Sequence, residues 1–454
     1  MGIFSSLSDE QKEATGILQI GTFLEYFDLM LYVHMSVVLN ELFFPKTDPH
    51  VESLISAIAF CTPFVFRPFG ALIFGYIGDT YGRKATVIIT TSMMAISCVA
   101  MANLPTYAQI GITATWGITI CRIIQGLSSM GEIIGAQIYL TELVKPPAQY
   151  PIVGLIACAD CFGALMALAI VTAVFAVGLE WRVAFWCGAI IALVGFVART
   201  ALRETPEFVN AKLQINKRFS NAQLDSSTLK EDLIVNNKVN IKTVIAYFLS
   251  YCASPACFYL IYIYCSGLLK NIFQYSSKQI VQHNLIVALI EFLIIVCYVF
   301  ASCKIHPLKL VKFRASLFSI FILFAPYLLS QVSSPFHILI IQSFLCLCWL
   351  HIIPATPIFF KHFTVFKRFT CASLIYAFSR GLMYIITSIG LVYLTEKFNH
   401  YGLLVVFVPL IIGFWYGLFY CEKMEKVNKK YPHNLSLNLS SDDNSQEVIV
   451  GNIN

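Results

Sequence analysis

Long apolar runs alternate with short polar connections along most of this chain. Twelve of these runs are long enough to cross a bilayer as helices, because about 20 apolar residues span its hydrocarbon core. The runs are apolar on every side, whereas the strands of a membrane barrel alternate apolar and polar positions. The expected spans are residues 17–43, 52–78, 85–104, 110–143, 149–177, 183–203, 243–269, 283–303, 315–331, 336–360, 370–395 and 400–420.

The spans form two groups of six, separated by one polar segment that carries Lys, Glu, Asp, Asn and Ser with few aromatic residues. The end of the chain is rich in Asn, Ser and Asp, a composition typical of disorder. The expected divisions are an N-terminal tail at 1–16, a six-helix bundle at 17–203, a central loop at 204–242, a second six-helix bundle at 243–420 and a disordered tail at 421–454.

Composition narrows the class of protein. The 454 residues are 58% hydrophobic and only 12% charged, whereas a soluble globular chain averages about 25% charged residues. This deficit excludes soluble globular, disordered and collagen-like classes. The sequence therefore predicts an all-α polytopic membrane protein.

The basic residues lie mainly on one side of the predicted membrane. With the N-terminus inside, 23 of the 31 Lys and Arg residues occupy inner segments and five occupy outer segments. Because inner loops are enriched in positive charge, both termini are expected in the cytoplasm. The net charge of +6 then reflects topology, so the expected surroundings are a lipid bilayer and no nucleic-acid partner is expected.

Eight charged residues lie at least eight positions from either end of their spans. An ionisable group at this depth is costly and usually faces a cavity or a partner. At about 1.5 Å per residue, six of them lie roughly 15–18 Å from the inner helix ends, near the bilayer midplane. We interpret this layer as a polar cavity between helices; the alternative is a set of structural ion pairs. The six are Asp28, Arg67, Glu132, Asp160, Glu291 and Arg380, and the other two are Glu25 and Arg122.

The first span presents two carboxylates on one helix face, because Glu25 and Asp28 are three residues apart. Two like charges in a low dielectric favour protonation of one of them, which suits a proton carrier. The alternative is that one of the two pairs with Arg67 and stays ionised.

A short loop after the second span reads Gly78-Asp79-Thr-Tyr-Gly82-Arg83. Its glycines permit a tight turn and a close helix approach. Asp79 and Arg83 offer opposite charges at the inner face, and Glu142 brings another carboxylate to the same face.

These residues resemble the major facilitator superfamily, and within it the metabolite:proton symporter family, whose carriers include those of proline and betaine, 2-oxoglutarate, citrate and shikimate. The resemblance implies two six-helix bundles in the bacterial inner membrane, a link between Arg122 and proton coupling, and a cytoplasmic gate formed by the loop residues and Glu142. The matching stretches are Glu25–Asp28, Arg67–Gly70, Gly78–Lys84, Arg122–Gly126, Gly131–Glu132, Trp181–Arg182 and Arg203–Phe208.

The second half resembles the family less. Its loop at residues 304–312 contains no acid and no glycine where the internal repeat would place a second Gly-Asp-x-x-Gly-Arg turn. The loop before the eleventh span keeps a basic stretch reminiscent of the family, with Lys361, Lys367, Arg368 and Thr370.

The expected function is proton-coupled symport of a small polar organic solute by alternating access between the two bundles. Arg67 and Arg380 are candidates for contacting a solute carboxylate, and Glu25, Asp28 and Glu132 for carrying or sensing the proton. A zwitterionic osmolyte such as proline or betaine is favoured over a mono- or dicarboxylate, because the layer holds four acids and two arginines. No cofactor, metal, obligate protein partner or enzymatic activity is expected.

Two other functions remain as alternatives. One is a membrane sensor, or a facilitator without proton coupling, that derives from a transporter and has a degenerate C-terminal half. The other is an intramembrane enzyme, which is disfavoured because the chain has no Asp-rich or His-x-x-x-His run.

Overall fold

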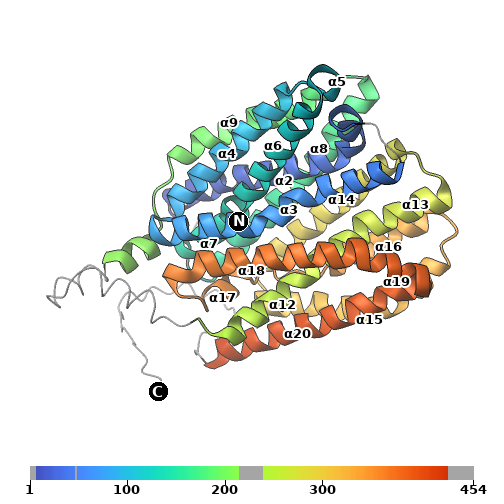
Figure 1. Cartoon of the computed structure of the whole chain (residues 1–454). Coiled ribbons are helices and arrows are strands. Elements are labelled where there is room, and N and C mark those ends of the chain that lie inside the picture. The colour runs from blue at the N-terminus through green and yellow to red at the C-terminus, as the bar shows by residue number, and fades with distance from the viewer. Residues whose placement is uncertain (1–6, 46–48, 214–238, 428–454) are drawn as a thin grey trace.

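The computed structural model describes residues 7–45, 49–213 and 239–427, and every regular element among them is a helix. Two groups of helices lie side by side, one drawn in blue to green and the other in yellow to red (Figure 1). Within the described residues, six helical stretches are long and apolar enough to cross a membrane. The all-helical membrane class predicted from the sequence is therefore confirmed.

The first group follows the first six predicted spans in order, with a short extra helix, α5, before the fourth. Its elements are α2 (Asp9–Phe43), α3 (Pro49–Thr80), α4 (Arg83–Asn103), α5 (Tyr107–Ile110), α6 (Ile112–Met130), η1 (Gly131–Gly135), α7 (Ala136–Leu143), α8 (Gln149–Val177) and α9 (Arg182–Thr200).

The second group follows the last six predicted spans, and the tenth is broken between α16 and α17. Its elements are α12 (Ile241–Phe258), η2 (Tyr259–Tyr264), α13 (Cys265–Phe273), α14 (Ser277–Ala301), α15 (Pro307–Ser330), α16 (Pro335–Cys348), α17 (Thr356–Phe360), α18 (Val365–Ile385), η3 (Ile386–Gly390), α19 (Leu391–Phe398), η4 (Asn399–Tyr401) and α20 (Gly402–Val427).

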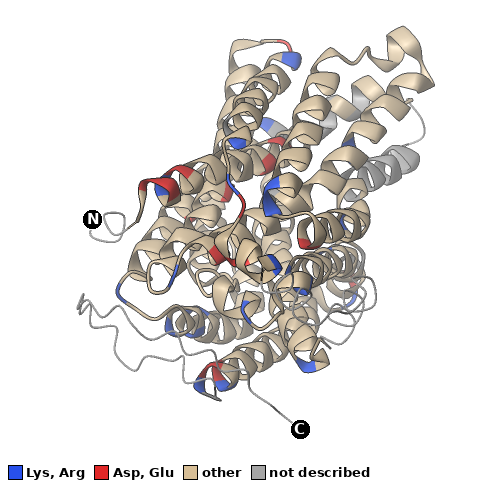
Figure 2. Cartoon of the chain, turned by 90° about the vertical axis from the view of Figure 1, so that its left-hand side faces the viewer, with Lys and Arg blue, Asp and Glu red and all other residues tan. Residues whose placement is uncertain are grey.

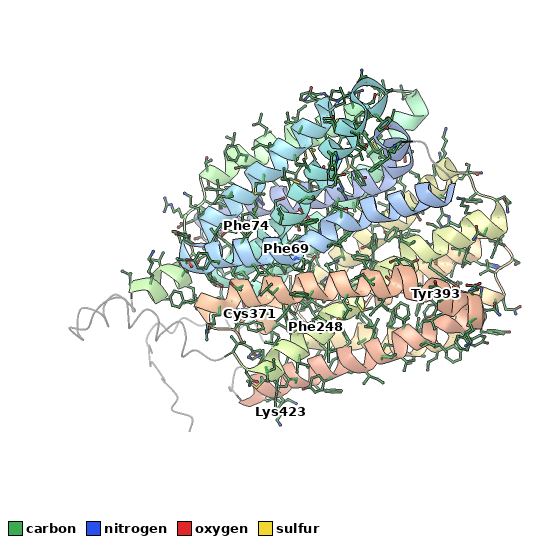
Figure 3. All side chains as sticks on the ribbon, viewed as in Figure 1. Phe69, Phe74, Phe248, Cys371, Tyr393 and Lys423 are labelled. Carbon is green, nitrogen blue, oxygen red and sulfur yellow. The ribbon has the colours of Figure 1, made fainter. Side chains whose placement is uncertain are left out.

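Apolar side chains cover the outside of the bundle and several charged ones lie within it. Phe69 is 56% exposed and Tyr393 is 70% exposed on the outer surface (Figure 3). Four arginines, by contrast, are among the largest fully buried side chains: Arg67, Arg83, Arg122 and Arg199. This reversal of the soluble pattern follows from a lipid surrounding, in which apolar groups are well solvated and charges are not.

The two groups meet along two helix pairs, α3 with α18 and α8 with α14. The α3–α18 contact requires a residue without a side chain at Gly75, because a Cβ there would lie 2.8 Å from the Cα of Thr370. These two pairs bring residues from both halves of the chain to the space enclosed between them.

Helix α15 begins at Pro307, eight residues before the predicted start of its span. His306 precedes it, and its Nδ1 accepts a hydrogen bond from the backbone N–H of Leu308 at 3.3 Å. Burial lowers the pKa of His306 to about 4, which leaves the ring neutral and able to accept this bond. The early start places Arg314 within the helix. The sequence had predicted that Arg314 lies in the inner loop just before this span.

Other predicted boundaries also need correction. Helix α20 continues to Val427, so residues 421–427 extend the last helix and do not begin the tail. Helix α2 begins at Asp9, inside the predicted N-terminal tail. Arg199, one of the 23 basic residues assigned to inner segments, is buried in α9 and donates a hydrogen bond to the Thr91 hydroxyl. The rest of the predicted central loop from 214 to 238 and of the tail from 428 lies outside the described residues.

Candidate functional site

A cavity of about 280 Å³ lies between the two groups of helices. Residues of α2, α3 and α8 line one side, and residues of α12, η2, α14, α15 and α18 line the other. Four members of the predicted charged layer line this cavity, and so does one arginine that the sequence placed in a loop. These lining residues are Arg67, Asp160, Glu291 and Arg380, with Arg314 as the addition.

Two opposite charges in the cavity are incompletely hydrogen-bonded. Arg380 is 8% exposed, its guanidinium lies 4.3 Å from the centre of the Tyr376 ring, and its Nε has no hydrogen-bond partner. Asp160 is 9% exposed, and its Oδ1 has no partner either. A buried polar atom without a partner costs about 1–3 kcal/mol, more if it is charged, so a polar solute that pairs with both is stabilised here.

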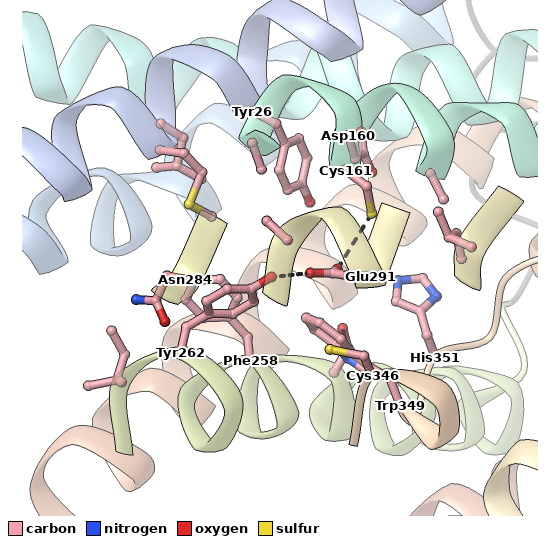
Figure 4. A pocket seen from close by; sticks show the side chains of 18 of the residues that line it. Tyr26, Asp160, Cys161, Phe258, Tyr262, Asn284, Glu291, Cys346, Trp349 and His351 are labelled. Atoms are coloured by element: carbon pink, nitrogen blue, oxygen red, sulfur yellow. Dashed lines mark hydrogen bonds between the residues drawn. The ribbon is translucent and has the colours of Figure 1, made fainter. Parts of the chain in front are cut away.

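Glu291 links the two halves inside the cavity. Its carboxylate accepts a hydrogen bond from the hydroxyl of Tyr262 on η2 and another from the thiol of Cys161 on α8, with an Sγ–Oε1 distance of 3.5 Å (Figure 4). Tyr262 lies in a π-helical turn, a feature that is frequent at functional sites. The sequence placed Glu291 in the charged layer and assigned it no role.

Aromatic rings supply much of the remaining wall. A cavity with apolar walls and a few converging polar groups is typical of small-molecule sites. The lining rings are those of Tyr26, Phe64, Phe258, Tyr262, Trp349 and Tyr384.

A second, smaller cavity in the first group of helices contains the remaining predicted charges of α2 and α6. Arg67 Nη2 donates to Glu25 Oε1 at 3.1 Å, and both side chains are 2% exposed. Glu25 therefore forms the ion pair that was the alternative to a proton carrier. Asp28 accepts a hydrogen bond from the Cys98 thiol at 3.3 Å, and no ion pair of Asp28 is found among the described residues.

Arg122 lines the same small cavity as Asp28, although its depth in the sequence placed it toward the outer side. Its Nη1 donates to Gln125 Oε1 at 2.8 Å, and its guanidinium lies 3.7 Å from the centre of the Tyr32 ring. The Nε and Nη2 atoms of Arg122 have no hydrogen-bond partner. The backbone of Glu132 lies in η1, and its side chain is outside what the structure describes.

The predicted gate residues form one network at the end of the bundle where α7 ends and α18 begins, the predicted cytoplasmic end. Arg83 is fully buried and donates to both oxygens of Glu142, at 3.1 and 3.0 Å. It also donates to Asp79 at 3.3 Å and to the carbonyl oxygen of Gly78. Figure 2 looks onto this end and shows acidic and basic segments near one another at its centre.

The network also joins the two halves of the chain. Asp79 accepts hydrogen bonds from the backbone N–H of Phe369 at 3.1 Å and from that of Thr370 at 2.9 Å. Arg368 donates to Glu142 at 2.9 Å, and Arg83 donates to the carbonyl oxygen of Val365 at 2.8 Å. These contacts close the predicted cytoplasmic end of the space between the halves.

Two glycines make the network possible. Gly82 has φ 125°, a conformation that L side chains rarely adopt, and a Cβ there would lie 1.9 Å from Glu204 Oε2. The Glu204 carboxylate accepts from the backbone N–H groups of Arg83 and Lys84, which begin α4. A Cβ on Gly78 would lie 2.6 Å from the Phe369 ring.

The structure brings the five predicted gate residues together and adds partners that the sequence did not identify. Arg368 and Thr370 were noted only as part of a basic stretch, and Glu204 only as part of a matching motif. No pattern in the sequence links Thr370 to Asp79, Arg368 to Glu142 or Glu204 to Arg83, because these contacts connect residues more than 100 positions apart. Among the described residues, no group of His, Cys, Asp and Glu could hold a metal ion.

Comparison with known families decides the class of protein. The model of the Major Facilitator Superfamily matches residues 18–388. This chain belongs to the Major Facilitator Superfamily. The resemblance inferred from the sequence motifs is therefore confirmed, and with it the fold; the orientation of the termini stays a prediction.

The chain is similar in sequence to two curated transport proteins. The proline/betaine transporter of Salmonella typhimurium is 33% identical over 205 residues, which are 43% of this chain and 41% of the relative. The inner membrane metabolite transport protein YhjE of Escherichia coli is 35% identical over 207 residues, 43% of this chain and 47% of the relative. The match thus spans less than half of each relative. Membership of the superfamily and the long apolar helices make the chain a multi-pass membrane protein.

A solved structure supports the same fold. The proton:xylose symporter XylE, bound to 6-bromo-6-deoxy-D-glucose, superposes with a TM-score of 0.71 and covers 92% of this chain and 96% of its own. The sequence identity is 15%, so the likeness concerns the fold alone.

Proposed function

We propose that this superfamily member is a proton-coupled symporter that moves a small polar organic solute by alternating access. The observation that carries the proposal is the cavity between the two halves, which is lined by incompletely paired charges of both signs and closed at one end by a gate. Sites of this kind, at the interface of two halves, are where transporters bind solute near the midplane.

A zwitterionic osmolyte is the preferred solute. The unpartnered Nε of Arg380 suits a carboxylate, and the unpartnered Oδ1 of Asp160 suits a cationic group. The aromatic walls suit a methylated ammonium, which is attracted to ring faces. A relative named as a proline/betaine transporter supports this preference. Mono- and dicarboxylates come next.

Arg380, and not Arg67, is the better candidate for the solute carboxylate. Arg67 also lines the cavity, but its charge is matched by Glu25 at 3.1 Å. Arg380 has no ion pair among the described residues, so it gains more from an anion than Arg67 does.

Alternating access requires the gate contacts to form and break. In the closed arrangement, Asp79 is bound to α18 and Arg368 is bound to Glu142. A solute or proton favours one arrangement only through its different affinity for the two. Loss of these contacts would let the halves separate at the predicted cytoplasmic end.

Proton coupling is assigned to the small cavity of the first half. Asp28 lies with Arg122 there, and the Glu25–Arg67 pair lies next to both. Protonation of a buried carboxylate removes its attraction for a neighbouring guanidinium and so changes which pairs are stable. Glu132 is retained as a second candidate proton carrier.

A sensor or an uncoupled facilitator with a degenerate C-terminal half is the alternative. That half lacks the loop motif, but its helix α18 supplies gate contacts through Val365, Arg368, Phe369 and Thr370. Since the second half takes part in closing the cavity, a working transporter is favoured.

The test is uptake of radiolabelled proline and glycine betaine into proteoliposomes, with and without an imposed pH gradient. We expect accumulation only with the gradient. Asp28→Asn and Glu132→Gln are each expected to abolish accumulation while solute exchange at equal pH continues. Asp9→Asn, at an exposed surface pair with Lys12, is the matched control and should behave as the wild type.

Accumulation that does not depend on the gradient would show a facilitator and contradict the coupling. No uptake of any tested solute would favour the sensor. Wild-type coupling in both variants would show that these carboxylates are structural.

A further inference from the structure

Arg314 is a buried arginine of the cavity to which the proposed transport cycle gives no role. It lies in α15, is 3% exposed and lines the cavity. Its guanidinium lies 4.4 Å from the centre of the Tyr298 ring, but neither Nε nor Nη1 has a hydrogen-bond partner. No ion pair of Arg314 is found in the part of the chain that the structure describes.

The neighbouring acid does not satisfy this arginine. Glu291 interacts electrostatically with Arg314. Its two carboxylate oxygens, however, accept hydrogen bonds from Tyr262 and Cys161. The Tyr298 hydroxyl is also engaged, because it donates to the carbonyl oxygen of Leu347 at 3.0 Å. The guanidinium of Arg314 therefore keeps N–H donors, including those of Nε and Nη1, that no protein group accepts, and these are left for a ligand.

The chemistry of that ligand follows from the donor. A guanidinium presents its N–H groups in a planar fork that matches the two oxygens of a carboxylate. The contact with the Tyr298 ring restricts where this guanidinium can lie. A neutral hydroxyl would satisfy one donor and leave the buried charge unmatched.

Arg314 and Arg380 lie at different levels of an elongated cavity. The lining residues of α14 run along one helix face from Ile280 to Ile295, about 22 Å at 1.5 Å per residue. Arg314 lies seven residues from the first residue of α15, or about 10 Å, and Arg380 lies fifteen residues from the first residue of α18, or about 22 Å. Both helices start at the predicted cytoplasmic end, so the arginines are two separate positive positions.

We propose that Arg314 forms a second carboxylate-binding subsite, so that the cavity also takes dicarboxylates, with one acid group on Arg380 and the other on Arg314. The inference rests on the proposed function of this cavity as the solute site. Zwitterionic solutes occupy Arg380 and Asp160 and leave the Arg314 subsite empty. Arg314 thus contacts dicarboxylates and not zwitterions, and it determines whether dicarboxylates are bound.

The test is equilibrium binding to the purified full-length protein with a series of α,ω-dicarboxylates of four to seven carbons, the matched monocarboxylates, and proline. Removal of a charge-assisted hydrogen bond weakens binding by about ten- to a hundred-fold. We expect this loss for the best dicarboxylate in Arg314→Gln, with proline and monocarboxylate affinities within about two-fold of wild type.

Two further variants make the result specific. Arg314→Lys keeps the charge and the stem but not the planar fork, so an intermediate loss for dicarboxylates is expected. Lys312→Gln removes a positive charge from the same helix, where Lys312 pairs with Glu422 and not with the cavity, and all affinities should be retained. Gel filtration and thermal unfolding establish that each variant is folded; if Arg314→Gln does not fold, Arg314→Lys carries the test.

Equal losses for proline and dicarboxylates in the Arg314 variants would show a structural role and overturn the proposal. Failure of every dicarboxylate to bind wild type would also overturn it, while gradient-driven proline uptake would leave the proposed function standing. If the Arg314 variants lose affinity for dicarboxylates only, and the wild type shows no gradient-driven uptake, the Arg314 subsite is supported and the proposed proton coupling is contradicted.

Discussion

The gate and the cavity hold their charges in different ways. At the gate, Arg83 donates to Glu142, Asp79 and two carbonyl oxygens, and Asp79 accepts three hydrogen bonds from Phe369 and Thr370. In the cavity, Arg380 and Asp160 each retain a buried polar atom without a partner. Both regions lie between the same two halves of the chain.

This difference separates the two tasks of a transporter. Paired charges stabilise one arrangement of the halves. The stabilisation that they provide is lost when either partner moves away. Unpaired charges stabilise nothing until a ligand arrives, and they make the site prefer a solute of matching charge. We therefore propose that the gate contacts stabilise one conformation, whereas the cavity charges select the solute.

The largest effect is expected from removing the central cation of the gate. Arg83→Gln leaves the buried Asp79 without a cation and leaves Glu142 with Arg368 as its one remaining arginine among the described residues. Breaking a buried ion pair costs about 3–5 kcal/mol. The closed arrangement should be largely lost, and hydrogen–deuterium exchange of the Phe369 and Thr370 amides should rise. Lys84→Gln, at the adjacent residue, is the control, and unchanged exchange in Arg83→Gln would show that the gate is not held by its charges.

The next effect concerns packing without any change of charge. Gly75→Ala places a methyl group 2.8 Å from the Cα of Thr370, and overpacking of this kind costs about 1–3 kcal/mol. Faster amide exchange at Thr370 and slower uptake are expected. Gly267→Ala, also on a helix but with nothing within 4 Å of the added methyl, should leave both unchanged. Equal effects of the two substitutions would contradict the role assigned to close packing.

Substitution in the cavity should act on affinity and spare the gate. Arg380→Gln is expected to weaken the binding of glycine betaine and of monocarboxylates by about ten- to a hundred-fold. Asp160→Asn should weaken only the zwitterion, because a monocarboxylate has no cationic group for it to contact. Equilibrium binding measures both, and a rise in gate amide exchange in either variant would show that the two regions are not separate.

The smallest effect is expected from an ion pair that does not join the halves. Lys312 and Glu422 pair between α15 and α20, within the second group of helices. A partly exposed pair of this kind contributes less than about 1 kcal/mol. Lys312→Gln should lower the thermal unfolding midpoint only slightly and leave gate exchange and uptake unchanged; a transport defect would show that paired charges outside the gate also control the conformation.

The fold could be predicted from the sequence because lipid imposes a simple pattern. Apolar runs such as 149–177 must be helical so that their backbone groups are paired, and α8 covers those residues. Boundaries were less accurate where polar residues continue a helix beyond the apolar run, as for Arg314 in α15 and for residues 421–427 in α20.

The site could be predicted only in part. Counting residues along each helix predicted that Asp160, Glu291 and Arg380 lie at a similar depth in the bilayer. In the structure all three line one cavity. Depth does not determine which way a side chain points, so the pairing of Arg67 with Glu25 remained one of two alternatives. Gate partners such as Arg368 depend on contacts between the halves, which no local pattern records.

The central claim is that the unpaired charges of the cavity await the solute, and a cryo-electron microscopy structure of the wild type with saturating glycine betaine tests it most directly. The account predicts density for the solute in the cavity, with its carboxylate within hydrogen-bond distance of Arg380 and its cationic group facing Asp160. Solute bound elsewhere, with Arg380 and Asp160 unchanged, would contradict the account.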